Sequence, residues 1–192
     1  GAPCSAEIVY VPPVTLTLCQ IGQDRVARLT WTNGAPTYDR IDIFLDGAAA
    51  PESPLPGTTT AYTSVPLVPG AHTVAVRPAI GTYLAAPREC TGTAIVPAPT
   101  GLACTAPADS WRVALSWTNN WSYASITVIR NGASIAALAG TATSYVDVAP
   151  ALGTYKYEVL GVFGGQSSAA ATCTLSLTVV PPVTLTACEI DA

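Results

Sequence analysis

Methionine is absent from these 192 residues, and lysine and histidine occur once each, as Lys156 and His72. Without methionine there is neither an initiator nor the start of a signal peptide, so we expect residue 1 to follow a cleavage or to be internal. Charged residues make up only 10% of the chain and the net charge is −4, which argues against the basic surface that nucleic-acid binding requires. No apolar run approaches the ~18 residues of a membrane span, so none is predicted.

Six cysteines recur at matched positions along the chain. A single histidine leaves little to share in metal ligation, which favours disulfides over a zinc site. Disulfides imply an oxidising compartment, and we therefore expect a secreted or cell-surface protein.

The two ends of the sequence are close copies of each other. Gly1–Gln23 aligns without a gap on Ala170–Ala192, so that Cys4 falls on Cys173, the run PPVTLT on its second copy, and Cys19 on Cys188. Self-similarity at a fixed period is the signature of a repeat architecture. The pattern predicts that this sequence is part of a longer periodic polymer. The repeating unit, arranged head to tail, would be as long as the offset between the two copies.

A weaker repeat divides that period in two. The cysteines follow it at nearly equal offsets, Cys19 with Cys104 and Cys90 with Cys173. Three motifs also match, in order: Leu29–Asn33 with Leu115–Asn119, Tyr38–Gly47 with Tyr123–Gly132, and Gly57–Tyr62 with Gly140–Tyr145. Closely spaced prolines mark the predicted seams. We expect the last strand of a preceding module at 1–11, full modules at 12–96 and 97–180, and the first strand of a following module at 181–192.

The segments between the seams have the pattern of β-strands. Val113, Leu115 and Trp117 share one parity, as in a half-buried strand. Asp46-Gly47 and Asn131-Gly132 provide residues that tolerate a positive φ at tight hairpin turns. No stretch predicts a helix of useful length. About seven short strands per ~85 residues predict two tandem antiparallel β-sandwiches, an all-β fold.

Both halves contain the motifs Leu-x-Trp-Thr-Asn, Tyr-x-x-Ile-x-Ile/Val before a glycine turn, and Gly-Thr-x-Thr-x-Tyr. Over Pro12–Val180 this order resembles fibronectin type III, twice over, and implies seven-stranded, immunoglobulin-like modules of a secreted bacterial repeat protein. The family's usual tyrosine, three residues past a Pro-Gly turn, is not in place. The first module has Thr73 there, and in the second Tyr155 and Tyr157 straddle the position.

Paired cysteines are absent from most of that family and resemble a feature of secreted bacterial versions. Each module has one cysteine near its first strand and one in its last, and we predict the bonds Cys19–Cys90 and Cys104–Cys173. Such bonds would tie the first strand of each module to its last. For Cys4 and Cys188 two alternatives stand: they pair with strands outside this sequence, or they bond across a subunit junction.

Acidic and imidazole groups offer two further candidate sites. Asp39, Asp42 and Asp46 cluster before a turn, and bunched carboxylates can hold calcium. Their spacing matches no loop motif, and a solvated strand face is the preferred interpretation, so no metal or cofactor is predicted. His72 has no nucleophile motif and no second histidine beside it, which favours a half-buried strand residue over catalysis.

Trp121 and Tyr123 are the candidate contact residues, in a loop that the first module fills with smaller residues. Trp121 either stacks on a sugar or packs on a neighbouring module or chain, or it folds back over its own sandwich. Asn120-Trp121-Ser122 is also a glycosylation sequon, meaningful only in a host that modifies such sites.

No paired carboxylates, nucleophile elbow or phosphate-binding glycine loop is present, and we predict no enzyme. The expected function is structural: an extracellular or cell-surface array or filament that serves spacing, adhesion or fibre building. Its expected partners are neighbouring copies, and a glycan or another surface protein is a further candidate. The alternative is an accessory spacer or carbohydrate-binding module of a secreted glycan-degrading enzyme.

Overall fold

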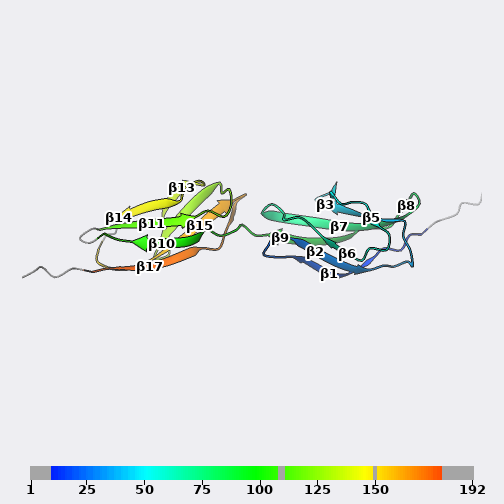
Figure 1. Ribbon diagram of the computed structural model, residues 1–192, viewed down its shortest axis with the longest axis horizontal. Coiled ribbons are helices and arrows are strands. Elements are labelled where there is room, and N and C mark those ends of the chain that lie inside the picture. The colour runs from blue at the N-terminus through cyan, green and yellow to red at the C-terminus, as the bar shows by residue number, and fades with distance from the viewer. Residues whose placement is uncertain (1–9, 108–110, 149–150, 179–192) are drawn as a thin grey trace, which may run out of the picture. The chain divides into compact units, whose positions relative to one another are not determined.

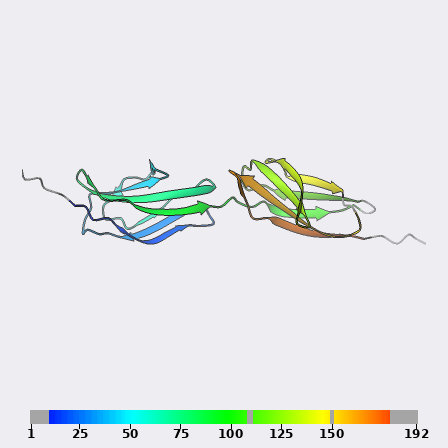
Figure 2. The same ribbon diagram turned by 180° about the vertical axis from the view of Figure 1, so that it is seen from behind.

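The computed structural model describes residues 10–107, 111–148 and 151–178, which form strands, turns and loops and no helix. The chain divides between Ile95 and Val96 into two compact units, called module 1 and module 2 below. In each unit two layers of strands face each other (Figure 1), and the view from behind shows the same two layers (Figure 2). The predicted all-β fold is confirmed.

Module 1 consists of two antiparallel sheets. The first has the order β1-β2-β6, with bounds Thr15–Ile21, Ala27–Thr32 and Ala61–Thr63. The second is built on β3 (Arg40–Leu45) and β7 (Gly70–Ile80), which pair with each other. Four further strands extend this sheet: β4 (Ala48–Ala49) and β5 (Leu55–Pro56) pair with β3, and β8 (Tyr83–Leu84) and β9 (Arg88–Ala94) pair with β7.

Module 2 repeats this arrangement. Its first sheet has the order β10-β11-β14, with bounds Thr100–Thr105, Arg112–Thr118 and Ser144–Val148. Its second sheet has β12 (Ser125–Arg130) between β13 (Ala133–Ala139) and β15 (Gly153–Phe163), and both β16 (Gln166–Ser167) and β17 (Ala171–Leu177) pair with β15. The short strands β5, β8 and β16 are additions to the seven strands that the sequence predicts for each module.

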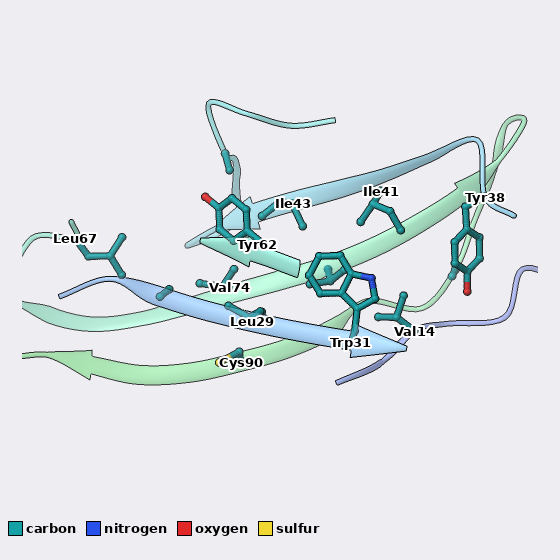
Figure 3. Close-up of a cluster of buried hydrophobic side chains, with 14 of the residues drawn as sticks. Val14, Leu29, Trp31, Tyr38, Ile41, Ile43, Tyr62, Leu67, Val74 and Cys90 are labelled. Carbon is teal, nitrogen blue, oxygen red and sulfur yellow. The ribbon is translucent and has the colours of Figure 1, made fainter. Parts of the chain in front are cut away.

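The cores form because alternate residues of each strand turn inward. In module 1, Leu29 and Trp31 of β2 meet Ile41 and Ile43 of β3 and Val74 of β7, all of them buried (Figure 3). Burying one such side chain contributes about 1.5–3 kcal/mol. The same parity buries Val113, Leu115 and Trp117 in module 2, as the alternation predicts.

The cores also include residues next to the predicted seams. Val11 is 4% exposed in the core of module 1, and Val96 is 3% exposed in the core of module 2. Each module therefore draws an apolar residue from the segment just before its own first strand. Val96 lies one residue ahead of the seam expected at Pro97.

Matching hairpin turns follow β3 and β12. Asp46 and Gly47 have φ values of 50° and 84°, and Asn131 and Gly132 have 49° and 83°. Two successive positive φ values define the type I′ turn that joins twisted strands, and Asp-Gly and Asn-Gly are the residue pairs that tolerate it. Both turns occur where the sequence predicts them.

Candidate functional site

The first and last strands of module 1 are joined by a disulfide between Cys19 and Cys90. Cys19 is on β1 and Cys90 on β9, and their Cα atoms are 5.4 Å apart. These strands belong to different sheets, so the bond also links the two layers across the edge of the sandwich. Cys90 is buried in the core, as Figure 3 shows.

Module 2 has the same bond between Cys104 of β10 and Cys173 of β17, with a Cα–Cα distance of 6.1 Å. The two disulfides are those predicted from the sequence. Together they define the most prominent shared feature of the chain, which we call the strand clamp: one covalent bond per module between its first and last strands. Cys4 and Cys188 lie outside the described residues.

A tyrosine in each module holds the segment that leads into the first strand. Tyr38 donates its hydroxyl hydrogen to the carbonyl oxygen of Pro12 at 2.8 Å, and Tyr123 donates to that of Pro97 at 2.8 Å. Tyr123 is only 7% exposed, and burial raises its pKa. Of the two candidate contact residues, Tyr123 is therefore placed inside its module, where it fixes the proline segment.

The repeated Trp-Thr-Asn and Gly-Thr motifs meet beside these tyrosines. In module 1 the indole nitrogen of Trp31 donates to Asn33 Oδ1 at 3.1 Å, and Asn33 Nδ2 donates to the carbonyl of Gly57 at 3.4 Å. A Cβ at Gly57 would lie 1.7 Å from the carbonyl oxygen of Tyr38, so only glycine fits there. Module 2 has the same contacts, with the same 1.7 Å approach at Gly140.

Trp121 packs onto its own module. Its ring meets that of Phe163 edge to face, with centroids 6.0 Å apart, and it lies against the core while half-buried. The neighbouring Asn120 of the sequon is engaged as well, because its Nδ2 donates to Ala98 O at 2.8 Å and to Thr100 Oγ1 at 3.0 Å. The loop is thus tied down by its own polar and aromatic groups.

A corner contact closes the other end of each sandwich. Tyr155 donates its hydroxyl hydrogen to the carbonyl oxygen of Ala151 at 2.7 Å, which is the tyrosine corner of such folds. Tyr155 lies two residues past Gly153, which is one residue before the position of the family's usual tyrosine. In module 1 His72 takes this position, with Nε2 2.6 Å from Val68 O.

The three clustered aspartates each have a structural partner. Asp39 accepts a hydrogen bond from the amide of Gly81, and Asp42 forms an ion pair with Arg40 at 3.1 Å. Asp46 contacts His72, described below. No group of three or more potential metal ligands converges within the part of the chain that the structure describes.

A buried polar cluster in module 2 was missed by the sequence reasoning. Asp147 Oδ2 accepts hydrogen bonds from Arg130 Nη1 at 2.7 Å and from the Tyr157 hydroxyl at 2.8 Å. Burial, followed by the bond to Asp147, raises the pKa of Tyr157. The available signal was the parity of Asp147, between the outward Val146 and Val148 of a strand whose alternate face is buried.

No family model and no curated protein matches this chain. Over the residues that the structure describes, no helix is long and apolar enough to cross a membrane. Solved structures do match. A two-domain fibronectin type III segment of chicken tenascin is 16% identical, with a TM-score of 0.66 over 85% of this chain and 97% of that chain. The chicken interferon gamma receptor alpha chain is 11% identical, with a TM-score of 0.52 over 88% and 100%.

These likenesses, the two facing sheets and the repeated core define the class of the protein. The chain consists of tandem modules with the fibronectin type III-like fold. Each of the two modules carries its own strand clamp.

Proposed function

We propose that the chain is a non-enzymatic structural unit of an extracellular or cell-surface array, in which each module keeps its length under tension. The observation that carries this proposal is the strand clamp. Force applied along the chain enters a module at its first strand and leaves at its last, and the cysteines join these two strands directly. Even an unfolded module could not extend the residues between its cysteines.

Repetition of the unit is supported by the sequence copies. Residues 180–192 resemble 11–23, which in module 1 comprise the segment before β1 and β1 itself. A following module that starts with such a strand would receive the same proline segment and the same clamp. We therefore propose the predicted modules, 12–96 and 97–180, with Val11 and Val96 each assigned to the module whose core they enter, flanking strands in the remaining residues at the two ends, and neighbouring copies as the partners.

An extracellular location is supported by the chemistry of the chain. Disulfides persist in oxidising compartments, and the absence of methionine removes one common target of oxidative damage. The lifetime of a protein outside the cell is set by how slowly it unfolds and is cleaved by proteases. Two clamped sandwiches with few charged side chains suit that requirement.

The mass of the native protein, denatured with and without reductant, tests the array. A species far larger than the 19.6 kDa of this chain, which reductant leaves unchanged, is expected for one repetitive chain. Collapse to the small species on reduction would instead place Cys4 and Cys188 at covalent junctions between subunits. A protein of the small mass that also stays monomeric under native conditions would contradict the proposal.

The accessory-module alternative has a separate readout. It predicts binding to an insoluble polysaccharide that is lost in Trp121→Ala. We expect no such binding, because the indole already packs against Phe163. Pull-down with the intact chain and with this variant distinguishes the two functions.

A further inference from the structure

The only histidine of the chain holds the corner of module 1 through both of its ring nitrogens. Nε2 of His72 is 2.6 Å from the carbonyl oxygen of Val68, in the segment before β7. Nδ1 is 2.7 Å from Oδ2 of Asp46, in the turn between β3 and β4. The second carboxylate oxygen of Asp46 accepts the amide hydrogen of Thr73 at 2.8 Å. One imidazole thus joins two separate loops to β7.

Both partners of this ring are acceptors only. A carbonyl oxygen and an ionised carboxylate cannot donate, and a neutral imidazole carries a single N–H. The doubly protonated ring can donate to both groups at once, whereas the neutral ring must leave one of the two short contacts without a hydrogen. The geometry therefore matches the imidazolium form.

The charges around the ring are few. Asp46 is the carboxylate in contact with it, and β9 presents Gly92 directly opposite His72. The charged residues of β9, Arg88 and Glu89, pair with Val76 and Ala75, further along β7. In the turn before β2, Arg25 donates from Nη1 to Leu67 O at 3.0 Å, next to Val68 in the chain, and Asp24 pairs with Arg28.

We propose that this corner is a pH-sensitive latch. While the imidazole carries two protons, it holds both the β3–β4 turn and the Val68 segment to β7. When the imidazole loses a proton, it can no longer donate to both and releases one of these two segments. The latch makes the stability of module 1 depend on pH near neutrality. It is a property of the fold and does not depend on the proposed function.

The direction of the pKa shifts agrees with this geometry. Burial lowers the pKa of His72, but the bonds to Val68 and Asp46 outweigh it and raise that pKa above its ordinary value of 6.5. The contribution of His72 is therefore complete below pH 6.5 and is lost as pH rises through the raised pKa. Burial raises the pKa of Asp46, but the bonds from Thr73 and His72 lower it below 3.8, so its contribution is lost only in acid.

Module 2 supplies the matched control within the same chain. Tyr155 replaces the histidine and donates one hydrogen bond to Ala151 O, and Asn131 replaces the aspartate and accepts from the amide of Lys156 at 2.8 Å. Neither of these two positions in module 2 holds an imidazole, so this corner lacks the group on which the latch depends.

The test follows the oxidised chain by NMR. Because His72 is the only histidine, its ring signals titrate without ambiguity, and we expect a midpoint above 6.5. Amide signals of β7 and β15 report urea unfolding of each module separately. When the pH is raised from about 6 to about 9, we expect the urea concentration at which module 1 is half unfolded to fall. The corresponding urea concentration for module 2 should stay constant.

Two variants convert the latch into its counterpart, His72→Tyr and Asp46→Asn. Both should remove the fall in the midpoint of module 1, and Asp46→Asn should also lower the titration midpoint of the remaining imidazole. An imidazole that titrates at or below 6.5 would overturn the latch. The latch would also be overturned if the urea midpoint of module 1 still fell with rising pH in Asp46→Asn. This second variant keeps the histidine, so the test remains valid even if His72→Tyr fails to fold.

Discussion

Opening the clamp of module 1 alone should strongly destabilise that module and leave its neighbour unaffected. The bond between Cys19 and Cys90 closes a loop with a sequence separation of 71 residues, and such a loop restricts the unfolded chain by about 4 kcal/mol in the chain-entropy model. A difference of that size is roughly a thousandfold in the folding equilibrium. With a urea dependence of about 1–3 kcal/mol per M, typical of small domains, the urea concentration at the unfolding midpoint should fall by roughly 1–4 M.

The assay is urea unfolding of the full chain, with the amide signals of β7 and β15 followed separately. The double variant Cys19→Ala/Cys90→Ala is compared with the oxidised chain. Cys90 is buried, so alanine also removes core volume, and the reduced wild-type chain keeps the sulfur atoms and separates the two effects. A reduced module 1 that unfolds at the same urea concentration as the oxidised one would refute the reasoning.

Three further substitutions test the contacts that the two modules share or differ in, each by urea unfolding. Gly57→Ala should destabilise module 1 by about 2 kcal/mol or more, because its Cβ would meet the carbonyl of Tyr38; a neutral outcome would show that the loop shifts freely. Tyr123→Phe should cost about 1 kcal/mol for the lost hydrogen bond to the proline segment, and no change would mean that water replaces it. Asp147→Ala should cost module 2 about 3 kcal/mol because it leaves the Arg130 guanidinium without its buried acceptor, and a stable variant would contradict that role.

The repeats in the sequence allowed much of the fold to be predicted, because a motif that occurs twice at one spacing identifies both a strand and its place. The parity of Val113, Leu115 and Trp117 defined a buried face, and all three are buried. The Asp-Gly and Asn-Gly turns were predicted from their conformational preference, which is local. Local chemistry of this kind is independent of the rest of the chain.

Apart from the two disulfides, contacts between side chains of different segments could not be predicted in the same way. The partners of His72 come from a turn 26 residues earlier and from a carbonyl four residues away, and a carbonyl leaves no mark in the sequence. Asp147 is an acidic residue, and an acidic residue is expected at the surface unless its buried partners are known. Its partners, Arg130 and Tyr157, lie on other strands. Trp121 could have faced a ligand or its own module until Phe163 was placed beside it.

Stretching single molecules of the chain from both ends tests most directly whether the clamp limits extension. With the disulfides intact, the residues between the paired cysteines, separated by 71 and 69 positions, should stay folded or looped and add nothing to the length. With reductant, each unfolding step should lengthen by roughly 240 Å, the extended span of a segment of that size. Unfolding steps of equal length with and without reductant would contradict the account.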